Sequence, residues 1–561
     1  MYASFLYSNN KVRIKSALLL VVPLVLAAFT HLWNPIGFPS IYVDEAHYMR
    51  RTLNVLEGSG PQESKEFFHH PYDHPYFGQL FLASILGAVG YPDLISLPES
   101  GNSDRSIEML YTVPRILMGV LSILDTFVLF KIAECRYDRK IACIAAILFA
   151  VMPLGWFIRR VWLESIQLPF LLLSILLVVR RQAKGTTEND GNNQNEKISI
   201  LIILISGVFL GLGIFTKIPV FAMIPLVGYL VYTNNHRNLK LLGIWFIPIL
   251  SIVLIWPAYA IYLGDFGDWF ADVFWQTSRS GEGDTVSEVI LDLFKIDPIL
   301  LVLGAAGLIV SIVKRDLFLF LWMLPYLIFS YVVVHSSYWY FIPLLPAFCM
   351  GAARLIAIVA NIMPKKKKTQ QILSFGMISA IGMFGLISTT MLITTNVTSA
   401  YFKAAEFVTQ SLSNNGDNKI LVTGGVGLAV YTWIPMNILD QGHDFRMLHI
   451  LFSGIPTTVS PLTETIDAMF IVDRLLNNTM TALINIPNDY ELDSLMQIFR
   501  VYNSTRTIAT FTGNTYTYDT EIYPYFDTET YPYYTMKFNN QLTPSGPDRI
   551  EVRTNFDSVS R

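Results

Sequence analysis

The chain has 561 residues, of which 52 % are hydrophobic and 15 % are charged, and its mean hydropathy is +0.44. An average soluble domain carries about 25 % charged residues, so this composition excludes an ordinary soluble enzyme, a disordered chain and a collagen-like fibre. The 3 cysteines exclude a disulfide scaffold or a thiolate metal cluster. The net charge of −3 is unevenly placed, because residues 396–561 carry 10 Lys and Arg against 17 Asp and Glu, and such an acidic segment makes nucleic acid an unexpected partner.

Apolar stretches long enough to cross a membrane fill residues 1–395. A bilayer core about 30 Å thick needs about 20 apolar residues in each helix, and about eleven stretches approach this length. The sequence therefore predicts a mainly α-helical membrane protein, a polytopic helical bundle of about 11 transmembrane helices. The expected spans are Ser16–Trp33, Tyr111–Ala133, Ile141–Phe157, Leu163–Val179, Ile198–Phe215, Ile218–Tyr232, Leu241–Leu263, Ile299–Val313, Leu317–Val334, Phe341–Met363 and Ile372–Thr394.

Clusters of Lys and Arg occur in alternate loops between these stretches, and the last of them is the run Lys365–Lys368. By the positive-inside rule these clusters face the cytoplasm, which places the N-terminus there as well. An odd number of spans then puts the residues after the last span outside. We expect an integral protein of the cell membrane with two long outside loops, 34–110 and 264–293, and an interfacial or re-entrant helix at Tyr76–Gly90.

Residues 396–561 are expected to form a separate extracytoplasmic domain of mixed α/β type. Lys419–Thr423 and Ala468–Val472 have the apolar composition of buried strands, and Lys403–Leu412 has the pattern of a helix. Phe499–Tyr525 alternates Thr, Tyr, Val and Ile, which indicates antiparallel strands or hairpins. The domain contains no cysteine, so disulfides cannot stabilise it.

The first outside loop carries an acidic pair and four of the nine histidines. Asp44 and Glu45 precede His47 and Tyr48, and the segment His69–Gln79 contains further histidines. Imidazole and carboxylate groups at a membrane surface suit proton transfer, phosphate binding or a metal ion, although their spacing is not that of a structural zinc site. The alternative interpretation is an ordinary solvated loop.

Several ionisable side chains lie within the apolar spans or at their ends, where such a group is costly and by default marks a functional site. The alternative is that long side chains snorkel to the interface. Several cations gather on the face that carries the acidic pair, which instead favours binding of an anionic lipid headgroup. The polar side chains at these positions are Arg115, Asp125, Arg159, Arg160, Glu164, Lys217, His335 and Tyr338.

Taken in order, these elements resemble the protein O-mannosyltransferase family and its bacterial relatives, the lipid A aminoarabinose transferases. Both are multi-spanning glycosyltransferases of the C type (GT-C), which use polyprenyl-phosphate sugars. Gln79 stands where the family has Lys, and Glu164 stands where it has Asp. The matching elements are Asp44-Glu45-x-His47-Tyr48, Asp73-His74-Pro75-Tyr76-Phe77-Gly78-Gln79-Leu80, Pro114-Arg115-Ile116, Arg159-x4-Glu164, Thr216-Lys217 and Tyr340-Phe341-Ile342-Pro343-Leu344-Leu345-Pro346.

The resemblance implies a GT-C membrane domain over residues 1–395 that transfers a hexose, with mannose favoured, from a polyprenyl- or dolichyl-phosphate donor. The acceptor is a hydroxyl of a protein, glycan or lipid on the outer face, and the transfer inverts the anomeric centre. Asp44 is the expected base, and Glu45 is expected to position the acceptor or a divalent cation, a possible but not a required cofactor. The implied donor-phosphate ligands are His74, Arg115, Arg159 and Lys217. The implied substrate-binding residues are His47, Tyr48, Glu164, His335 and Tyr338.

Two other classes of protein fit part of the pattern. A transporter or flippase for lipid-linked sugars explains the spans and the buried cations, but not an acidic pair in a long loop. It also lacks support from paired broken helices. A membrane-anchored scaffold protein explains the spans alone. Release of polyprenyl phosphate from a polyprenyl-phosphate sugar separates the enzyme from both.

Overall fold

A computed structural model describes most of the membrane domain and seven strands of the C-terminal segment. The chain divides into two compact units. Unit 1 comprises Met1–Trp33, Arg51–Ala83 and Ile116–Met391, and unit 2 comprises Asn34–Arg50, Ser84–Arg115 and Leu392–Arg561. The described residues are 2–39, 43–62, 70–91, 103–179, 200–235, 237–278, 285–332, 338–362, 367–394, 419–422, 444–447, 468–472, 506–512, 516–518, 542–544 and 549–554.

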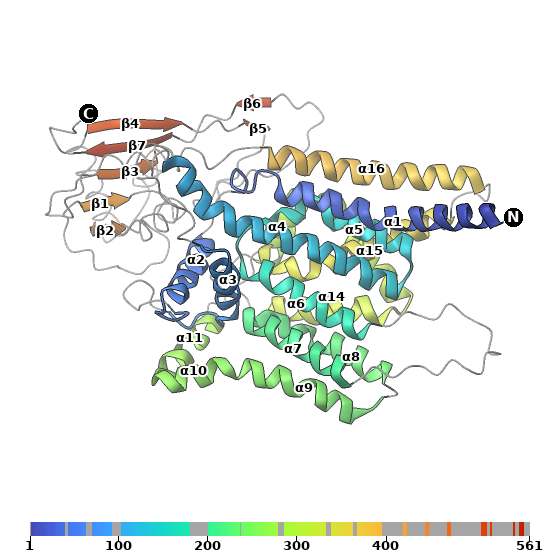
Figure 1. The fold of residues 1–561 in the computed structure, drawn as a ribbon, viewed down its shortest axis with the longest axis horizontal. Coiled ribbons are helices and arrows are strands. Elements are labelled where there is room, and N and C mark those ends of the chain that lie inside the picture. The colour runs from blue at the N-terminus through green and yellow to red at the C-terminus, as the bar shows by residue number, and fades with distance from the viewer. Residues whose placement is uncertain are drawn as a thin grey trace. The chain divides into compact units, whose positions relative to one another are not determined.

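The described part of the membrane domain is helical throughout (Figure 1), which confirms the expected mainly α-helical class. The helices are α1 Tyr2–Leu32, α2 Val43–Leu56, α3 Phe77–Ala88, α4 Ser103–Arg136, α5 Arg139–Val151, η1 Pro153–Arg159, α6 Leu163–Val178, α7 Ile200–Thr216, η2 Ile218–Met223, α8 Ile224–Asn234, α9 Leu239–Val253, α10 Ile255–Leu263, α11 Phe266–Ser278, α12 Val286–Ile296, α13 Pro298–Val313, α14 Leu317–Val332, η3 Tyr338–Leu344, α15 Leu345–Ile362 and α16 Lys367–Ile393.

Each of the expected spans overlaps one of these helices. Among the described residues, four helical stretches are long and apolar enough to cross a membrane alone, and two bent pairs, broken by 66° and 119°, raise that number to 6. Shorter apolar helices account for the remaining expected spans, so the total of eleven stays a prediction. The 4 long stretches are Glu108–Arg136, Leu239–Leu263, Tyr338–Asn361 and Phe375–Ile393.

Small residues bring the helices of unit 1 into close contact. Helices α6, α7 and α9 lie side by side (Figure 1). A Cβ atom at Gly207 of α7 would lie 2.4 Å from the carbonyl oxygen of Trp245 on α9, so only glycine permits this approach. Ser174 of α6 and Ser206 of α7 each donate to the other's carbonyl oxygen, at 2.8 and 2.9 Å. These contacts fix the helices that carry the candidate site.

The two segments expected to be long outside loops, 34–110 and 264–293, contain more helix than the sequence indicated. The expected helix at Tyr76–Gly90 is present as α3, whereas α2, α11 and α12 were not expected. Helix α12 begins with a capping box, in which Thr285 and Glu288 satisfy each other's backbone N–H groups. These helices are short and amphipathic, so a search for long apolar stretches passes over them.

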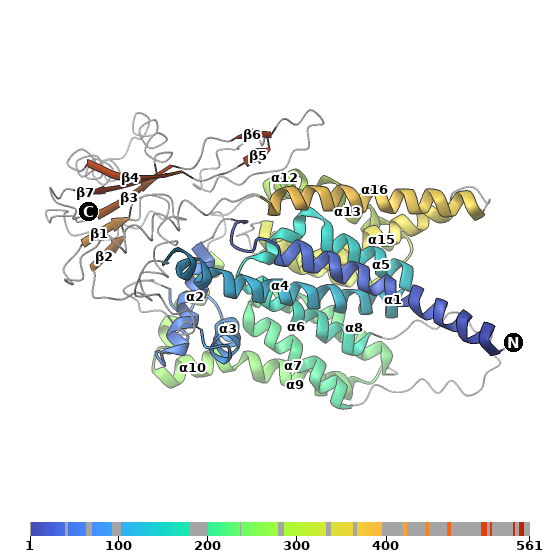
Figure 2. The same ribbon diagram turned by 45° about the horizontal axis from the view of Figure 1, so that its top comes forward.

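The strands of unit 2 form a five-stranded mixed sheet and a two-stranded sheet (Figure 2). The order of the larger sheet is β2-β1-β3-β7-β4; β1 is parallel to β2 and β3, and β7 is antiparallel to β3 and β4. The smaller sheet pairs β5 with β6 in antiparallel orientation. The strands are β1 Lys419–Val422, β2 Asp444–Met447, β3 Ala468–Val472, β4 Arg506–Thr512, β5 Tyr516–Tyr518, β6 Leu542–Pro544 and β7 Arg549–Thr554.

Two of the strands, β1 and β3, confirm sequence predictions. The segment Phe499–Tyr525 contains the strands β4 and β5, and both pair in antiparallel orientation, which confirms the first of the two alternatives, antiparallel strands or hairpins. Their partners are the later strands β7 and β6, so β4 and β5 form no hairpin with each other. The helix expected at Lys403–Leu412 lies outside the described residues. The mixed α/β class of the domain therefore stays a prediction.

Candidate active site

The acidic pair lies in the first turn of a helix and not in an extended loop. Asp44 and Glu45 are the second and third residues of α2, where the helix dipole stabilises negative charge. Asp44 is half-buried, whereas Glu45 is buried. The expectation of a loop was wrong because α2 is polar and follows the first span without a long apolar pattern.

Glu45 forms a buried bidentate ion pair with Arg115 of α4 inside unit 2. The Arg115 Nε and Nη2 atoms donate to the two Glu45 oxygens at 3.1 and 2.8 Å, and Nη1 donates to the carbonyl oxygens of Pro35 and Pro39 at 3.1 and 2.7 Å. The side chains are 1 % and 4 % exposed. Such paired charge-assisted bonds fix both orientation and position. The guanidinium expected at the donor phosphate is thus engaged with Glu45 and backbone carbonyls.

His47 and Tyr48 follow the acidic pair by one turn of α2. Tyr48 stands four residues after Asp44, so the two share one face of the helix. Tyr48 is buried and His47 is half-buried. Both therefore lie within about one turn of the acidic pair in α2, and their assignment to substrate binding stays a prediction.

A second buried ion pair lies in unit 1, between Lys217 and Glu164. Lys217 precedes η2 and Glu164 lies in the first turn of α6. Lys217 Nζ is 2.5 Å from Glu164 Oε1 and 4.6 Å from the ring centroid of Tyr340. Gln167 donates to the backbone carbonyls of Lys217 and Gly213, which holds the turn between α7 and η2. The cation is thus held at the turn between α7 and η2, beside the first turn of α6.

The other cationic candidates of unit 1 lie around η1. Arg159 is buried and its Nη2 atom donates to the carbonyl oxygen of Trp33. The Arg160 guanidinium lies 5.3 and 5.0 Å from the rings of Trp156 and Trp162, which fits a structural cation–π contact. Tyr338 of η3 is buried, with its ring 5.0 Å from that of Phe157 on η1. His335 lies outside the described residues.

The segment His70–Pro75, called the His-Pro segment below, is attached to α2 by an ion pair. Asp73 lies 2.8 Å from Arg51 of α2 and 3.8 Å from the Nε2 atom of His74. The helix that follows, α3, packs tightly through Gly78, where a Cβ atom would lie 2.5 Å from a methyl group of Leu163 and 3.2 Å from one of Thr216. Leu163 and Thr216 are the neighbours of Glu164 and Lys217. The structure therefore packs the helix that follows the His-Pro segment against the residues next to Lys217 and Glu164.

Two carboxylates of the segment 264–293 were missed by sequence reasoning. Asp272 of α11 accepts bonds from the Tyr72 backbone N–H and from the His70 ring, both at 2.8 Å. Asp265 accepts from the Tyr72 hydroxyl at 3.0 Å. Burial raises the pKa of the Tyr72 phenol, so the hydroxyl keeps its proton and donates. The only available signal was a pair of acidic residues in an aromatic-rich segment.

Gln79 of α3, which replaces the family lysine, is fully buried. Within the described part of the chain, neither its amide nitrogen nor its amide oxygen has a hydrogen-bond partner. A buried amide without partners is unfavourable by about 1–3 kcal/mol. This side chain is therefore a candidate for contact with a bound polar ligand.

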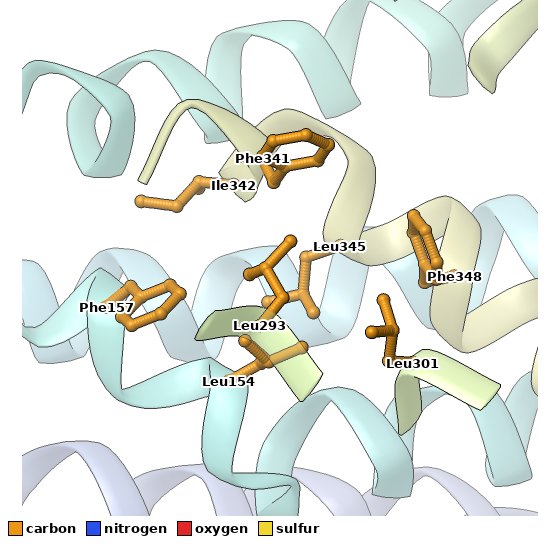
Figure 3. A pocket seen from close by; sticks show the side chains of 8 residues that line it. All are labelled: Leu154, Phe157, Leu293, Leu301, Phe341, Ile342, Leu345 and Phe348. Atoms are coloured by element: carbon orange, nitrogen blue, oxygen red, sulfur yellow. The ribbon is translucent and has the colours of Figure 1, made fainter. Parts of the chain in front are cut away.

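An apolar pocket lies among η1, α12, α13, η3 and α15 (Figure 3). Its volume of about 20 Å³ is enough for one water molecule, so it does not hold a sugar or a lipid chain in this conformation. The pocket is lined by Leu154, Phe157, Leu293, Leu301, Phe341, Ile342, Leu345 and Phe348.

Among the described residues, no three His, Cys, Asp or Glu side chains are grouped so as to hold a metal ion.

Residues 21–266, which contain nearly all of these side chains, match the family model described as dolichyl-phosphate-mannose-protein mannosyltransferase. The resemblance to C-type glycosyltransferases is confirmed. No match was found among curated protein sequences.

Solved structures share the fold along almost the whole chain. ArnT from Cupriavidus metallidurans bound to undecaprenyl phosphate is 12 % identical, with a TM-score of 0.56 over 97 % of this chain and 98 % of that one. The apo oligosaccharyltransferase of Archaeoglobus fulgidus is 13 % identical, with a TM-score of 0.52 over 85 % of this chain and 72 % of that one. Family match and fold together support an integral membrane protein with the fold of the C-type glycosyltransferases.

Proposed function

We propose that the protein transfers a hexose, with mannose favoured, from a polyprenyl- or dolichyl-phosphate donor to an acceptor hydroxyl. The match of residues 21–266 to the mannosyltransferase family is the observation that carries the proposal. The structure of ArnT bound to undecaprenyl phosphate supports a polyprenyl donor for this fold. The acceptor is a protein, a glycan or a lipid.

The reaction is a single inverting displacement in which Asp44 takes the proton of the acceptor hydroxyl. The acceptor oxygen bonds to the anomeric carbon as the bond from that carbon to the phosphate oxygen breaks. Polyprenyl phosphate leaves with an added negative charge. The position of Asp44 beside the fixed Glu45–Arg115 pair supports its assignment as the base.

Glu45 and Arg115 act in this mechanism by holding the start of α2, because each satisfies the other. Lys217, Arg159 and His74 stabilise the charge that develops on the leaving phosphate. The remaining substrate-binding residues are His47, Tyr48, Glu164, His335 and Tyr338.

Release of polyprenyl phosphate is the decisive test. Purified protein is incubated with a polyprenyl-phosphate mannose and a mixture of hydroxyl acceptors, and the lipid product is quantified. Accumulation of polyprenyl phosphate together with a mannosylated acceptor supports the proposal. Unchanged donor contradicts it, and transbilayer movement of that unchanged donor identifies a flippase.

Gln79→Lys is expected to leave the apparent KM for donor unchanged or to lower it. The variant adds a cation directly after Gly78, which packs against Leu163 and Thr216, the neighbours of Glu164 and Lys217. A fixed charge beside a poorly hydrated donor phosphate is worth more than in water. The measurement is steady-state transfer at varied donor concentration. Gln79→Met has a similar size and no charge, so it separates charge from bulk. If the KM for donor rises in the lysine variant but not in the methionine variant, residue 79 lies away from the phosphate.

We propose that residues 396–561 form an extracytoplasmic domain and that the N-terminus is cytoplasmic. A cysteine introduced by Ser460→Cys is then expected to react with a membrane-impermeant maleimide in intact cells. The parent chain supplies the background labelling of its native residues Cys135, Cys143 and Cys349. Labelling that appears only after lysis would invert the topology and would place Asp44 inside.

A further inference from the structure

Helix α11 contacts the His-Pro segment through Asp272 and Trp275. The Asp272 carboxylate is only 6 % exposed, and its two oxygens accept from two different groups of the segment. Oδ1 faces the Nδ1 atom of His70 and Oδ2 faces the backbone N–H of Tyr72, both at 2.8 Å. A carboxylate only accepts, so the His70 ring carries its proton on Nδ1.

Ring contacts and a second carboxylate strengthen the same attachment. The His70 ring is stacked on Trp275 of α11, with centroids 3.8 Å apart and planes at 13°. The Tyr72 hydroxyl donates to Asp265, just before α11. Tyr72 is buried in an aromatic and apolar cluster with Tyr76, Phe215 and Trp256. Asp272 and Asp265 bind the backbone and side chain of Tyr72, and Asp272 and Trp275 bind the ring of His70. Together these contacts hold the segment in one conformation.

The attachment matters because the segment continues directly into candidate site residues. Asp73 pairs with Arg51, and Arg51 lies on the helix that begins with the acidic pair. His74 follows, and Gly78 then packs against the neighbours of Lys217 and Glu164. A displacement of Tyr72 would therefore move Asp73 and His74 together. In enzymes a displacement of about 1 Å can lower the rate by about 10²-fold.

We propose that Asp272 is a positioning residue, which fixes the segment His70–His74 of the first outside loop from α11 of the second. This inference rests on the proposed function. Asp272 touches neither donor nor acceptor, so its removal acts on the chemical step through Asp73 and His74. Because the buried carboxylate binds two donors at once, it specifies the segment's conformation better than a single contact would.

The test compares Asp272→Ala with Asp272→Asn and with Asp268→Asn. Asn keeps an oxygen that accepts from the Tyr72 N–H, whereas Ala removes both bonds. Asp268→Asn removes the same charge from the same helix. Two quantities are measured on the full-length protein in detergent: hydrogen exchange of a peptide that covers residues 70–76, and kcat and KM for release of polyprenyl phosphate.

We expect Asp272→Ala to speed exchange of residues 70–76 and to lower kcat by about 10- to 100-fold with donor KM changed less than about threefold. Asp272→Asn should recover most of both losses, and Asp268→Asn should match the parent. Unchanged exchange, a kcat equal to the parent, or faster exchange spread over α6 and α7 would each overturn the proposal. If the parent releases no polyprenyl phosphate, the proposed function fails, and the exchange measurement alone decides whether Asp272 fixes the segment.

Discussion

Asp44→Asn is expected to lower sugar transfer by about 10²-fold or more while donor binding persists. Asparagine keeps the size of the side chain and the helical position in α2 but cannot take a proton from the acceptor hydroxyl. The loss should therefore fall on kcat and not on the KM for the polyprenyl-phosphate sugar. Initial rates of transfer at saturating donor, together with donor binding by the purified variant, provide the measurement.

Glu45→Gln is the matched control, because it removes the neighbouring carboxylate from the same helical turn. Glu45 is buried against Arg115, so this variant leaves an uncompensated guanidinium and should destabilise the fold by about 3–5 kcal/mol. A melting temperature close to that of the parent is expected for Asp44→Asn, in contrast to Glu45→Gln. Near-normal transfer by the Asn variant would remove Asp44 from the mechanism.

Hydropathy was enough to locate the membrane helices, since crossing a bilayer demands only a long apolar stretch. Every expected span overlaps an observed helix, although several are bent or shorter than a full crossing. Bending depends on contacts with neighbouring helices, as between α12 and α13, which meet at 119°. No local sequence pattern specifies such an angle.

Partner choice among the charged residues was beyond sequence reasoning. The sequence placed Arg115 at the donor phosphate and Glu45 at the acceptor, whereas in the fold the two side chains bind each other across 70 positions of the chain. Glu164 and Lys217 likewise pair across 53 positions. Burial makes such pairing necessary, because an isolated charge is costly there. The sequence identifies which charges are buried but not which ones neutralise each other.

Sequence reasoning also missed helices that lie outside the long apolar stretches. Helix α11 was expected to be a loop, so Asp272 carried no assignment. Its role follows only from the folded backbone, which turns one acidic residue toward Tyr72 and His70. A helix of 13 residues is too short to span a bilayer, so a search for long apolar stretches does not find it.

Lys217→Met is expected to raise the apparent KM for donor, to lower kcat, and to reduce kcat/KM by about 10²-fold. The leaving phosphate gains negative charge at the membrane boundary, where it is poorly hydrated and where a fixed cation is worth more than in water. Methionine keeps the length of the stem and removes the charge. Steady-state release of polyprenyl phosphate at varied donor concentration measures both constants.

The ion pair with Glu164 requires a second variant before this result is interpreted. Lys217→Met alone leaves a buried carboxylate uncompensated, at a cost of about 3–5 kcal/mol in the free energy of unfolding. Adding Glu164→Gln removes that charge, so the double variant should recover thermal stability. If Lys217 serves the donor phosphate, transfer stays low in the double variant although its fold is restored. Transfer that returns together with stability would make the pair purely structural, and the phosphate site would then consist of Arg159 and His74.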